Sequence, residues 1–169
     1  IFLKKYYQRN KFAEAYNPSG NYGDVAYRNQ VNKFNHTGYG LAATYFVNDD
    51  IQCKASYEKS YRLPEANELY GDIITFAGNL SLNPASSNHY NLGVSFWKHT
   101  NSKHSFNFNT SGFYRDAKDF IRPTLNKNQS RQVMDNLASV TNLGVEAEVR
   151  YNFNNQISLG AHLTYQKSA

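Results

Sequence analysis

Apolar and polar residues alternate along most of this chain, with a repeat of two rather than of three or four. In 51–63 the odd positions are mainly apolar and the even positions wholly polar. Successive side chains of a strand point to opposite faces, so this period predicts β-strands with one apolar and one polar face. The same separation recurs in five further segments: 38–47, 88–98, 104–115, 142–153 and 157–166. A weaker strand is expected at 1–7.

The predicted strands are about ten residues or more, longer than is usual in soluble sheets and long enough to cross a bilayer when tilted. Their connections alternate between short polar turns at 48–50, 99–103 and 154–155 and long segments at 9–34, 64–87 and 116–140. Outer-membrane barrels have short periplasmic turns and long external loops. On that pattern 51–63, 104–115 and 156–167 rise toward the exterior, while 36–47, 88–98 and 141–153 descend.

Aromatic residues divide between the two ends of the predicted strands, as the interfacial girdles of a membrane barrel require. The set near the short turns is Tyr45, Phe46, Phe96, Trp97, Tyr151 and Phe153. The set toward the long segments is Tyr57, Tyr61, Tyr90, Tyr114 and Tyr165. A β-sandwich, with these tyrosines in its core and at its edges, is the alternative architecture.

The number of strands decides how much of a barrel is present. Six or seven are fewer than the roughly eight of the smallest membrane barrels. The expected fold is therefore all-β, an antiparallel meander of about six to seven long strands that forms part of a larger transmembrane β-barrel. Such a piece has two unpaired edges, so the isolated chain is expected to self-associate through them.

Composition and charge narrow the class further. The mean hydropathy of −0.69 and the lack of a long apolar run exclude a transmembrane helix. The net charge is +5, yet Lys and Arg are scattered along the sequence, which indicates a solvated rim and no nucleic-acid partner. Cys53 is the single cysteine, so an internal disulfide is excluded. Without an initiator Met or a signal peptide, the chain is expected to begin inside a longer protein.

Residues 54–97 carry motifs that resemble those of one family. Tyr61-Arg62-Leu63-Pro64 and Asn67-Glu68-Leu69-Tyr70 are followed by a box at 78–84 that keeps Asn79, Leu82 and Pro84. Gly144-Val145-Glu146 adds a later match. Together they resemble the TonB-dependent outer-membrane receptors. Leu80 and Ala85 depart from that family's box, where it has a proline and a glutamate.

The resemblance implies a receptor in the outer membrane of a Gram-negative bacterium that imports a bulky scarce nutrient: an iron chelate such as a siderophore, cobalamin or a similar solute. All of 1–169 would be barrel, with the plug domain and the remaining strands absent. Energy would come from a TonB-type complex through those absent segments. No catalytic residue, metal site or cofactor is implied. Haem-uptake members place a histidine in the loop between the two boxes, and none occurs from Arg62 to Pro84.

Two sets of candidate site residues follow. The external loop offers candidate ligand contacts at Arg62, Glu65, Glu68, Tyr70 and Asp72. For Arg62 the preferred interpretation is structural pairing with Glu58 or Glu68, and contact with the plug domain is a further alternative. The polar strand faces would line the lumen or hold the plug: Gln52, Lys54, Ser56, Glu58, Glu146, Glu148 and Arg150.

Two other classes of protein stay open on the sequence. One is a secreted β-sandwich binding module or adhesin, and the other is an outer-membrane barrel enzyme. An enzyme would need a nucleophile beside a base, and Ser158 and His162 share a strand face about 13 Å apart, too far to hydrogen-bond.

Overall fold

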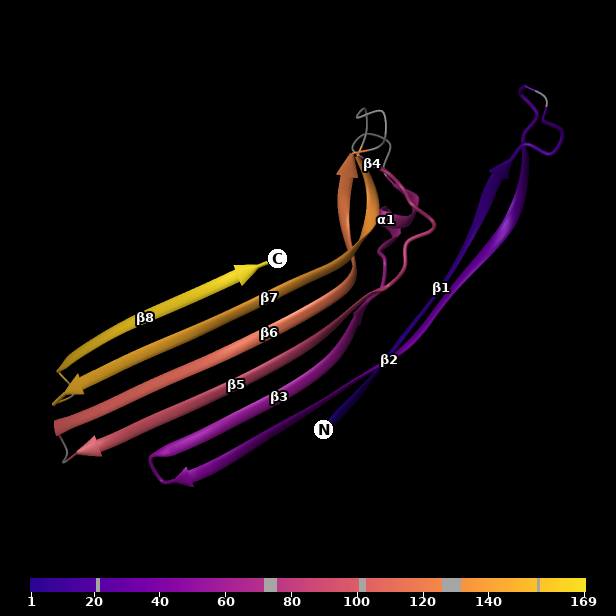
Figure 1. The fold of residues 1–169 in the computed structure, drawn as a ribbon. Coiled ribbons are helices and arrows are strands. Elements are labelled where there is room, and N and C mark those ends of the chain that lie inside the picture. The colour runs from indigo at the N-terminus through magenta and orange to yellow at the C-terminus, as the bar shows by residue number, and fades with distance from the viewer. Residues whose placement is uncertain (21, 72–75, 101–102, 126–131, 155) are drawn as a thin grey trace.

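The computed structural model describes residues 1–20, 22–71, 76–100, 103–125, 132–154 and 156–169, and its fold is a single sheet (Figure 1). Between the strands Ile51–Arg62 (β3) and Ala85–Thr100 (β5) lie a short helix, α1 (Ala66–Tyr70), and a two-residue strand, β4 (Phe76–Ala77). Seven long strands make an antiparallel meander: β1 (Phe2–Tyr16), β2 (Ala26–Asn48), β3 (Ile51–Arg62), β5 (Ala85–Thr100), β6 (His104–Leu125), β7 (Gln132–Phe153) and β8 (Ile157–Ser168).

The predicted meander is confirmed, and the sheet is not closed. In the described ranges β1 pairs only with β2, and β8 only with β7. No helix in these ranges has the length and apolar character needed to span a membrane.

The strand register gives the sheet one apolar and one polar face. Ala55 lies opposite Leu92, and Leu92 lies opposite Gly112, whereas Lys54 lies opposite Gly93 on the other side of the sheet. The apolar face is open to its surroundings: Leu41 is 50% exposed, Leu92 68%, Val145 50% and Leu163 70%. Among the described residues no second layer covers it, so the sandwich architecture is wrong.

A row of tyrosines crosses the apolar face at one end of this band. Tyr39, Tyr57, Tyr90 and Tyr114 come from β2, β3, β5 and β6, with successive ring centroids 5.9, 5.0 and 6.0 Å apart. Near the short turns Phe96 and Phe106 pack with centroids 6.0 Å apart. From position 106 to 114, β6 advances about 26 Å, which at a tilt near 40° spans about 20 Å of membrane thickness. Two aromatic levels therefore border the apolar band.

Three aromatic residues assigned to these girdles lie elsewhere. Phe46 pairs with Gln52 and Trp97 with Asn107, so both belong to the polar face. Tyr61 lies just above the last β2–β3 pair, Tyr39 with Lys59, and stacks on His36 at a centroid distance of 4.6 Å. Nearness to a turn places an aromatic residue at the right height, but only the register fixes the face to which it points.

The expectation of irregular loops at 9–34 and 116–140 is wrong, because most of these residues are in strands. Pairing between β1 and β2 continues to Tyr16 and Ala26, and pairing between β6 and β7 to Leu125 and Gln132. In these upper parts polar residues occur on both faces, as in Asn29–Lys33. The apolar–polar contrast disappears although the ladder continues, so the periodicity test missed them.

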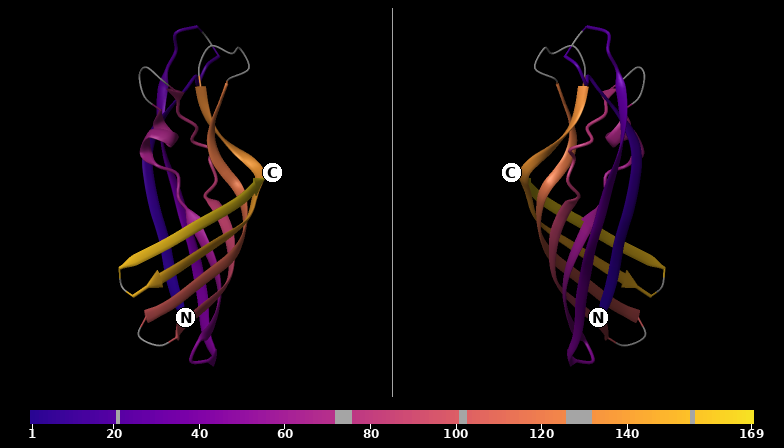
Figure 2. Two further views of the ribbon diagram at one scale, coloured as in Figure 1. Left: turned by 90° about the vertical axis from the view of Figure 1, so that its left-hand side faces the viewer. Right: turned by 90° about the vertical axis from the view of Figure 1, so that its right-hand side faces the viewer.

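The segment 63–85 does not project as a free loop. β3 and β5 end lower than the two tall hairpins β1–β2 and β6–β7, and Figure 2 shows α1 and its flanking chain inside the curve of the sheet, between those hairpins. β4 pairs in parallel with Gln132 and Val133 of β7. The buried apolar cluster of the described chain forms here: Leu69, Leu82, Ala85, Ile121 and Met134, with Leu80 against it. The core therefore sits where this segment packs on the polar side of β6 and β7.

Candidate functional site

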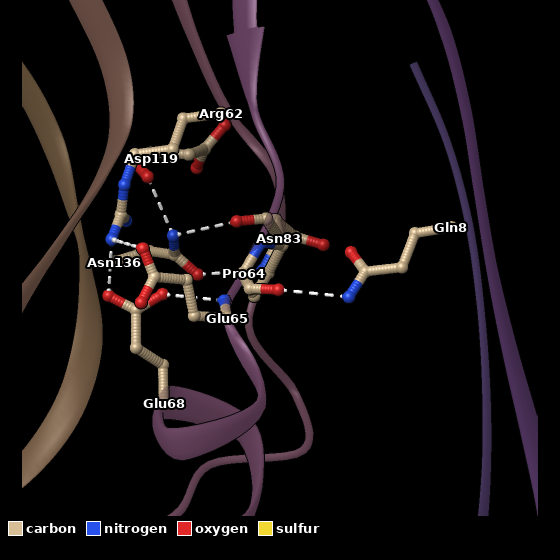
Figure 3. Close-up of polar contacts among 8 residues, drawn as sticks. All are labelled: Gln8, Arg62, Pro64, Glu65, Glu68, Asn83, Asp119 and Asn136. Carbon is tan, nitrogen blue, oxygen red and sulfur yellow. Dashed lines mark hydrogen bonds and ion pairs between the residues drawn. The ribbon is translucent and has the colours of Figure 1, made fainter.

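An ion pair closes the turn that leads into α1. Arg62, the last residue of β3, places its Nη2 2.6 Å from Oε1 of Glu68, and the backbone N–H of Glu65 donates to Oε2 of the same carboxylate at 2.8 Å (Figure 3). Glu68 is 6% exposed. A buried carboxylate is stable only when its oxygens are bonded, and both are. Of the two partners considered for Arg62, Glu68 is the one that it pairs with, and Glu58 instead bonds Lys4.

Side chains on the polar faces of β1 and β2 hold the segment on one side. Gln8 Nε2 donates to the carbonyl of Pro64 at 3.0 Å, and Asn32 Nδ2 donates to the carbonyl of Leu80 at 3.2 Å. The ring of Phe12 meets Tyr70 edge-on at a centroid distance of 6.1 Å. These contacts attach the segment to the first tall hairpin.

A pair of asparagines holds the segment to the second hairpin. Asn136 of β7 accepts from the N–H of Asn83 at 2.9 Å and donates to the carbonyls of Asn83 and Asp119, at 3.1 and 2.7 Å (Figure 3). Asn79 Nδ2 donates to the carbonyl of Met134 at 2.9 Å. An amide carries both donors and an acceptor, so one side chain can link two or three backbone groups.

Gly78 is required by close backbone approach. A Cβ at this position would collide with the carbonyl oxygen of Leu69 and the backbone of Tyr70 and Gly71. The box at 78–84 thus presses directly on the end of α1. Most residues that carry the sequence motifs here, Arg62, Pro64, Glu68, Leu69, Asn79 and Leu82, are occupied in folding the segment and fastening it inside the sheet.

The candidate ligand contacts separate into two groups. Glu65 and Tyr70 face solvent, with the Glu65 side chain 66% and Tyr70 48% exposed, and the Arg62 side chain is 45% exposed despite its ion pair. The Glu68 carboxylate is enclosed in the turn. Asp72 lies outside the described residues.

All seven candidate lumen residues lie on the polar face. Lys54 and Glu146 lie in one row of paired residues across the strands, with Gly93 and Ser111 between them. Gln52 and Glu148 lie in the neighbouring row. Ser56 accepts from Asn91 Nδ2 at 3.1 Å, and Arg150 bonds Glu148 at 3.0 Å. Lys54, Glu146, Glu148 and His162 border a hollow of about 260 Å³. The face is thus a charged, hydrogen-bonding wall.

Three further residues of this wall were not among the candidates: Lys4, His89 and Arg115. Lys4 of β1 reaches Glu58 at 2.8 Å across β2, where Gly38 and Gly40 leave room. His89 accepts at Nδ1 from Arg115 Nε at 2.9 Å, and its Nε2 lies 2.6 Å from Ser87 Oγ. The alternation identifies the face of each residue, but β1 had no firm register, so the Lys4–Glu58 pair could not be foreseen.

The Ser87–His89 contact does not make a catalytic pair. A guanidinium only donates, so Nδ1 of His89 must be the acceptor and the ring proton is on Nε2. That N–H then donates to Ser87 Oγ, whereas a general base needs an unprotonated nitrogen facing the nucleophile. In the described ranges no group of three or more His, Cys, Asp or Glu side chains is placed to hold a metal ion.

A curved wall with an apolar outer face, a polar inner face and an inward-folded loop defines a segment of a large transmembrane β-barrel. The family description "TonB dependent receptor-like, beta-barrel" matches residues 6–169. The chain belongs to the TonB-dependent receptor β-barrel family.

Solved structures of such receptors share the fold at low sequence identity. The siderophore receptor PirA from Pseudomonas aeruginosa superposes with a TM-score of 0.69 at 15% identity, over 85% of this chain and 28% of that protein. The copper transporter OprC gives 0.68 at 15%, over 96% and 26%. The Serratia marcescens hemophore receptor HasR, solved with its hemophore HasA and heme, gives 0.63 at 13%, over 99% and 30%.

This chain therefore spans less than a third of the length of those receptors. A search of curated proteins found no match. Family and neighbours are receptors and transporters rather than enzymes.

We expect Glu68→Ala to loosen the segment 63–85. The substitution removes the Arg62 ion pair and the bond to the Glu65 N–H, so the free energy of local opening should fall by about 1–3 kcal/mol. Hydrogen exchange of the α1 amides in the full-length receptor should accelerate by about 5- to 160-fold, and the exchange rate of Glu68→Gln should lie between those of the unaltered receptor and Glu68→Ala. The control is Glu146→Ala, an exposed carboxylate without an ion pair among the described residues. Equal exchange in all three variants would show that the ion pair does not hold the turn.

Proposed function

We propose that this chain is the wall and part of the external face of an outer-membrane receptor of a Gram-negative bacterium, which imports a bulky scarce nutrient. The two-faced single-layer sheet carries the proposal. Its apolar residues have no protein partner in the described chain and need acyl chains, while the charged inner face needs water or a plug. Energy would reach the receptor from a TonB-type complex through segments outside this chain.

The nutrient class is an iron chelate, cobalamin or another bulky chelate. The solved neighbours include a siderophore receptor, a copper transporter and a hemophore receptor, so the fold is compatible with several cargoes. No histidine lies between Arg62 and Pro84 to ligate haem iron from this loop. That supports a chelate other than haem, recognised through its own ligand groups.

The residues take different roles in this proposal. Glu65, Tyr70 and the exposed part of Arg62 are the ligand contacts of the segment, with Asp72 beside them in sequence, whereas Glu68 acts by holding Arg62. The seven polar-face residues, joined by Lys4, His89 and Arg115, form the surface against which a plug would pack. Paired charges on this surface suit contact with a removable domain, because they leave few unpaired groups when it moves.

Substitution on either face of one strand should test the membrane wall. Val94 points to the apolar face and its neighbour Ser95 to the polar face. We expect Val94→Arg to destabilise the full-length receptor in phosphatidylcholine vesicles by about 2–4 kcal/mol, since it places a charge among acyl chains. Ser95→Arg should cost less than about 1 kcal/mol. Urea unfolding in vesicles measures both, and equal costs would contradict a lipid-facing apolar side.

Uptake by the full-length receptor tests the cargo. Cells lacking their own receptors should accumulate one of three labelled probes, a ferric siderophore, cobalamin or a copper chelate, when this receptor is expressed. Accumulation should stop when an uncoupler collapses the proton gradient, while surface binding persists. Uptake that survives the uncoupler would mean a passive pore, and uptake of none of the three would overturn the nutrient class.

The isolated 169-residue chain should self-associate. β1 and β8 each present a row of backbone donors and acceptors with no partner strand in the described chain, and such rows pair with another copy. Light scattering of the refolded chain in detergent should show dimers or larger species. A monodisperse monomer would contradict this expectation.

A further inference from the structure

One residue of the tall β6–β7 hairpin has a backbone conformation that extended strands do not use. Asp119 of β6 has φ +54°, whereas strand residues have φ of roughly −120° to −140°. It is the one residue with positive φ in the strands that the structure describes. This left-handed conformation is unfavourable for a residue with a Cβ, although Asp tolerates it better than most residues. Such strain persists only where neighbouring contacts impose it.

The β6–β7 ladder is interrupted at Asp119 without a shift of register. The pairs on either side, Lys118 with Ser139 and Phe120 with Leu137, follow one register, and no pair joins the two residues between them. A β-bulge would insert an extra residue into one strand, and none is inserted here. The strand therefore changes its course through the torsion angle of one residue. Figure 1 shows the hairpin turning from the slant of the lower wall to a steeper course beside α1.

The side chain of Asn136 joins Asp119 to the segment 63–85 (Figure 3). Its Nδ2 donates to the carbonyl of Asp119 at 2.7 Å and to the carbonyl of Asn83 at 3.1 Å, and its Oδ1 accepts from the N–H of Asn83 at 2.9 Å. Two of these three bonds require the segment to be in place. The orientation of the amide that serves the strained residue is thus the one that the seated segment fixes.

Above Asp119 the inner side of the hairpin packs on the same segment. Ile121 and Met134 lie in the buried cluster with Leu69 and Leu82. The main chain of β7 also pairs with β4 at positions 132–133. The upper part of the hairpin is therefore held against a piece of chain that does not belong to the wall, while the lower part is held by strand pairing with β5 and β8.

We propose that Asp119 is the hinge of the β6–β7 hairpin, and that Asn136 holds this hinge bent only while the segment 63–85 is seated. When the segment shifts, Asn136 loses both bonds to Asn83, and its amide is free to turn away from the Asp119 carbonyl. Asp119 then relaxes toward an extended conformation, and the upper hairpin changes its angle to the wall. This device does not depend on which nutrient is carried.

Spin labels on either side of the hinge test this in the full-length receptor, held in phosphatidylcholine nanodiscs. Leu125 at the top of β6 and Leu143 in the wall part of β7 are 62% and 53% exposed, so each should tolerate a label. Cys53 is replaced by Ser so that it takes no label. Electron–electron distance measurements should give one narrow distribution for the otherwise unaltered sequence. Asn136→Leu removes all three bonds and should broaden or shift that distribution, and an unchanged distribution would overturn the clamp.

Asn142→Leu is the matched control, because Asn142 lies on the same strand below Asp119, opposite Arg115. It should leave the distance distribution unchanged. Equal broadening by Asn136→Leu and Asn142→Leu would show a general loss of packing and reject the hinge. Hydrogen exchange of the wall amides 106–115 should stay slow in both variants. Loss of protection there in Asn136→Leu would mean that this residue supports the whole barrel, which also rejects the hinge.

Substitution of Asp119 gives a second test that leaves Asn136 in place. Glycine adopts positive φ readily, whereas a β-branched residue resists it. Both variants keep the backbone carbonyl that accepts from Asn136. Asp119→Gly should therefore keep the mean distance of the unaltered receptor, and Asp119→Val should shift it. Equal mean distances in the two variants would show that the bend does not depend on this torsion angle.

Loosening the segment at a distance from the hairpin tests the coupling. Glu68→Ala removes the ion pair with Arg62 without touching Asn136 or Asn83. It should broaden the distance distribution between the labels at 125 and 143, whereas Glu146→Ala should not. If the α1 amides exchange faster in Glu68→Ala while the distribution stays narrow, the segment moves without the hairpin and the proposed coupling is wrong.

Discussion

The structure depends on one constraint: a single-layer sheet with one apolar and one polar face is stable only when acyl chains contact the first face and water or polar groups contact the second. Antiparallel pairing satisfies the backbone of the strands, so their side chains alone decide what each face can contact. The apolar side chains here are not shielded by any described part of the chain, with Leu92 68% and Leu163 70% exposed. In water such a surface would associate, whereas in acyl chains it is stable without a second layer. The polar face then follows, because a barrel closed around water needs polar side chains inside.

The buried core follows from the same constraint. A sheet with lipid on one side and a lumen on the other has no interior of its own, so the apolar cluster of Leu69, Leu82, Ile121 and Met134 forms where the 63–85 segment covers the inner side of β6 and β7. Polar anchors surround the cluster and join both tall hairpins to it. The segment therefore connects the two tall hairpins on the inner side of the sheet. Its motif residues Glu68 and Asn79 form the hydrogen bonds that hold it there.

Sequence periodicity predicted the strands in the parts of the wall that face two different environments, and it failed where both faces meet water. The pairings of 26–34 and 116–125 were missed for that reason. The polar-face candidates share one side of the sheet because strand alternation is strict, but partners such as Lys4 and Glu58 lie 54 residues apart and depend on register. The conformation of 63–85 could not be predicted from the sequence either. The residues that hold it come from four strands, and alternation within a strand does not show which strands lie close together.

Ion pairing also differs between the two faces. Three inward cations lie against acids at 2.6–3.0 Å: Lys4 against Glu58, Arg62 against Glu68 and Arg150 against Glu148. Among the outward cations above the tyrosine row, Lys5 bonds the hydroxyl of Thr37 and Lys59 lies over the ring of Tyr61. Exposed Lys and Arg are tolerated on this face because their apolar stems cover the sheet while their charged ends reach water.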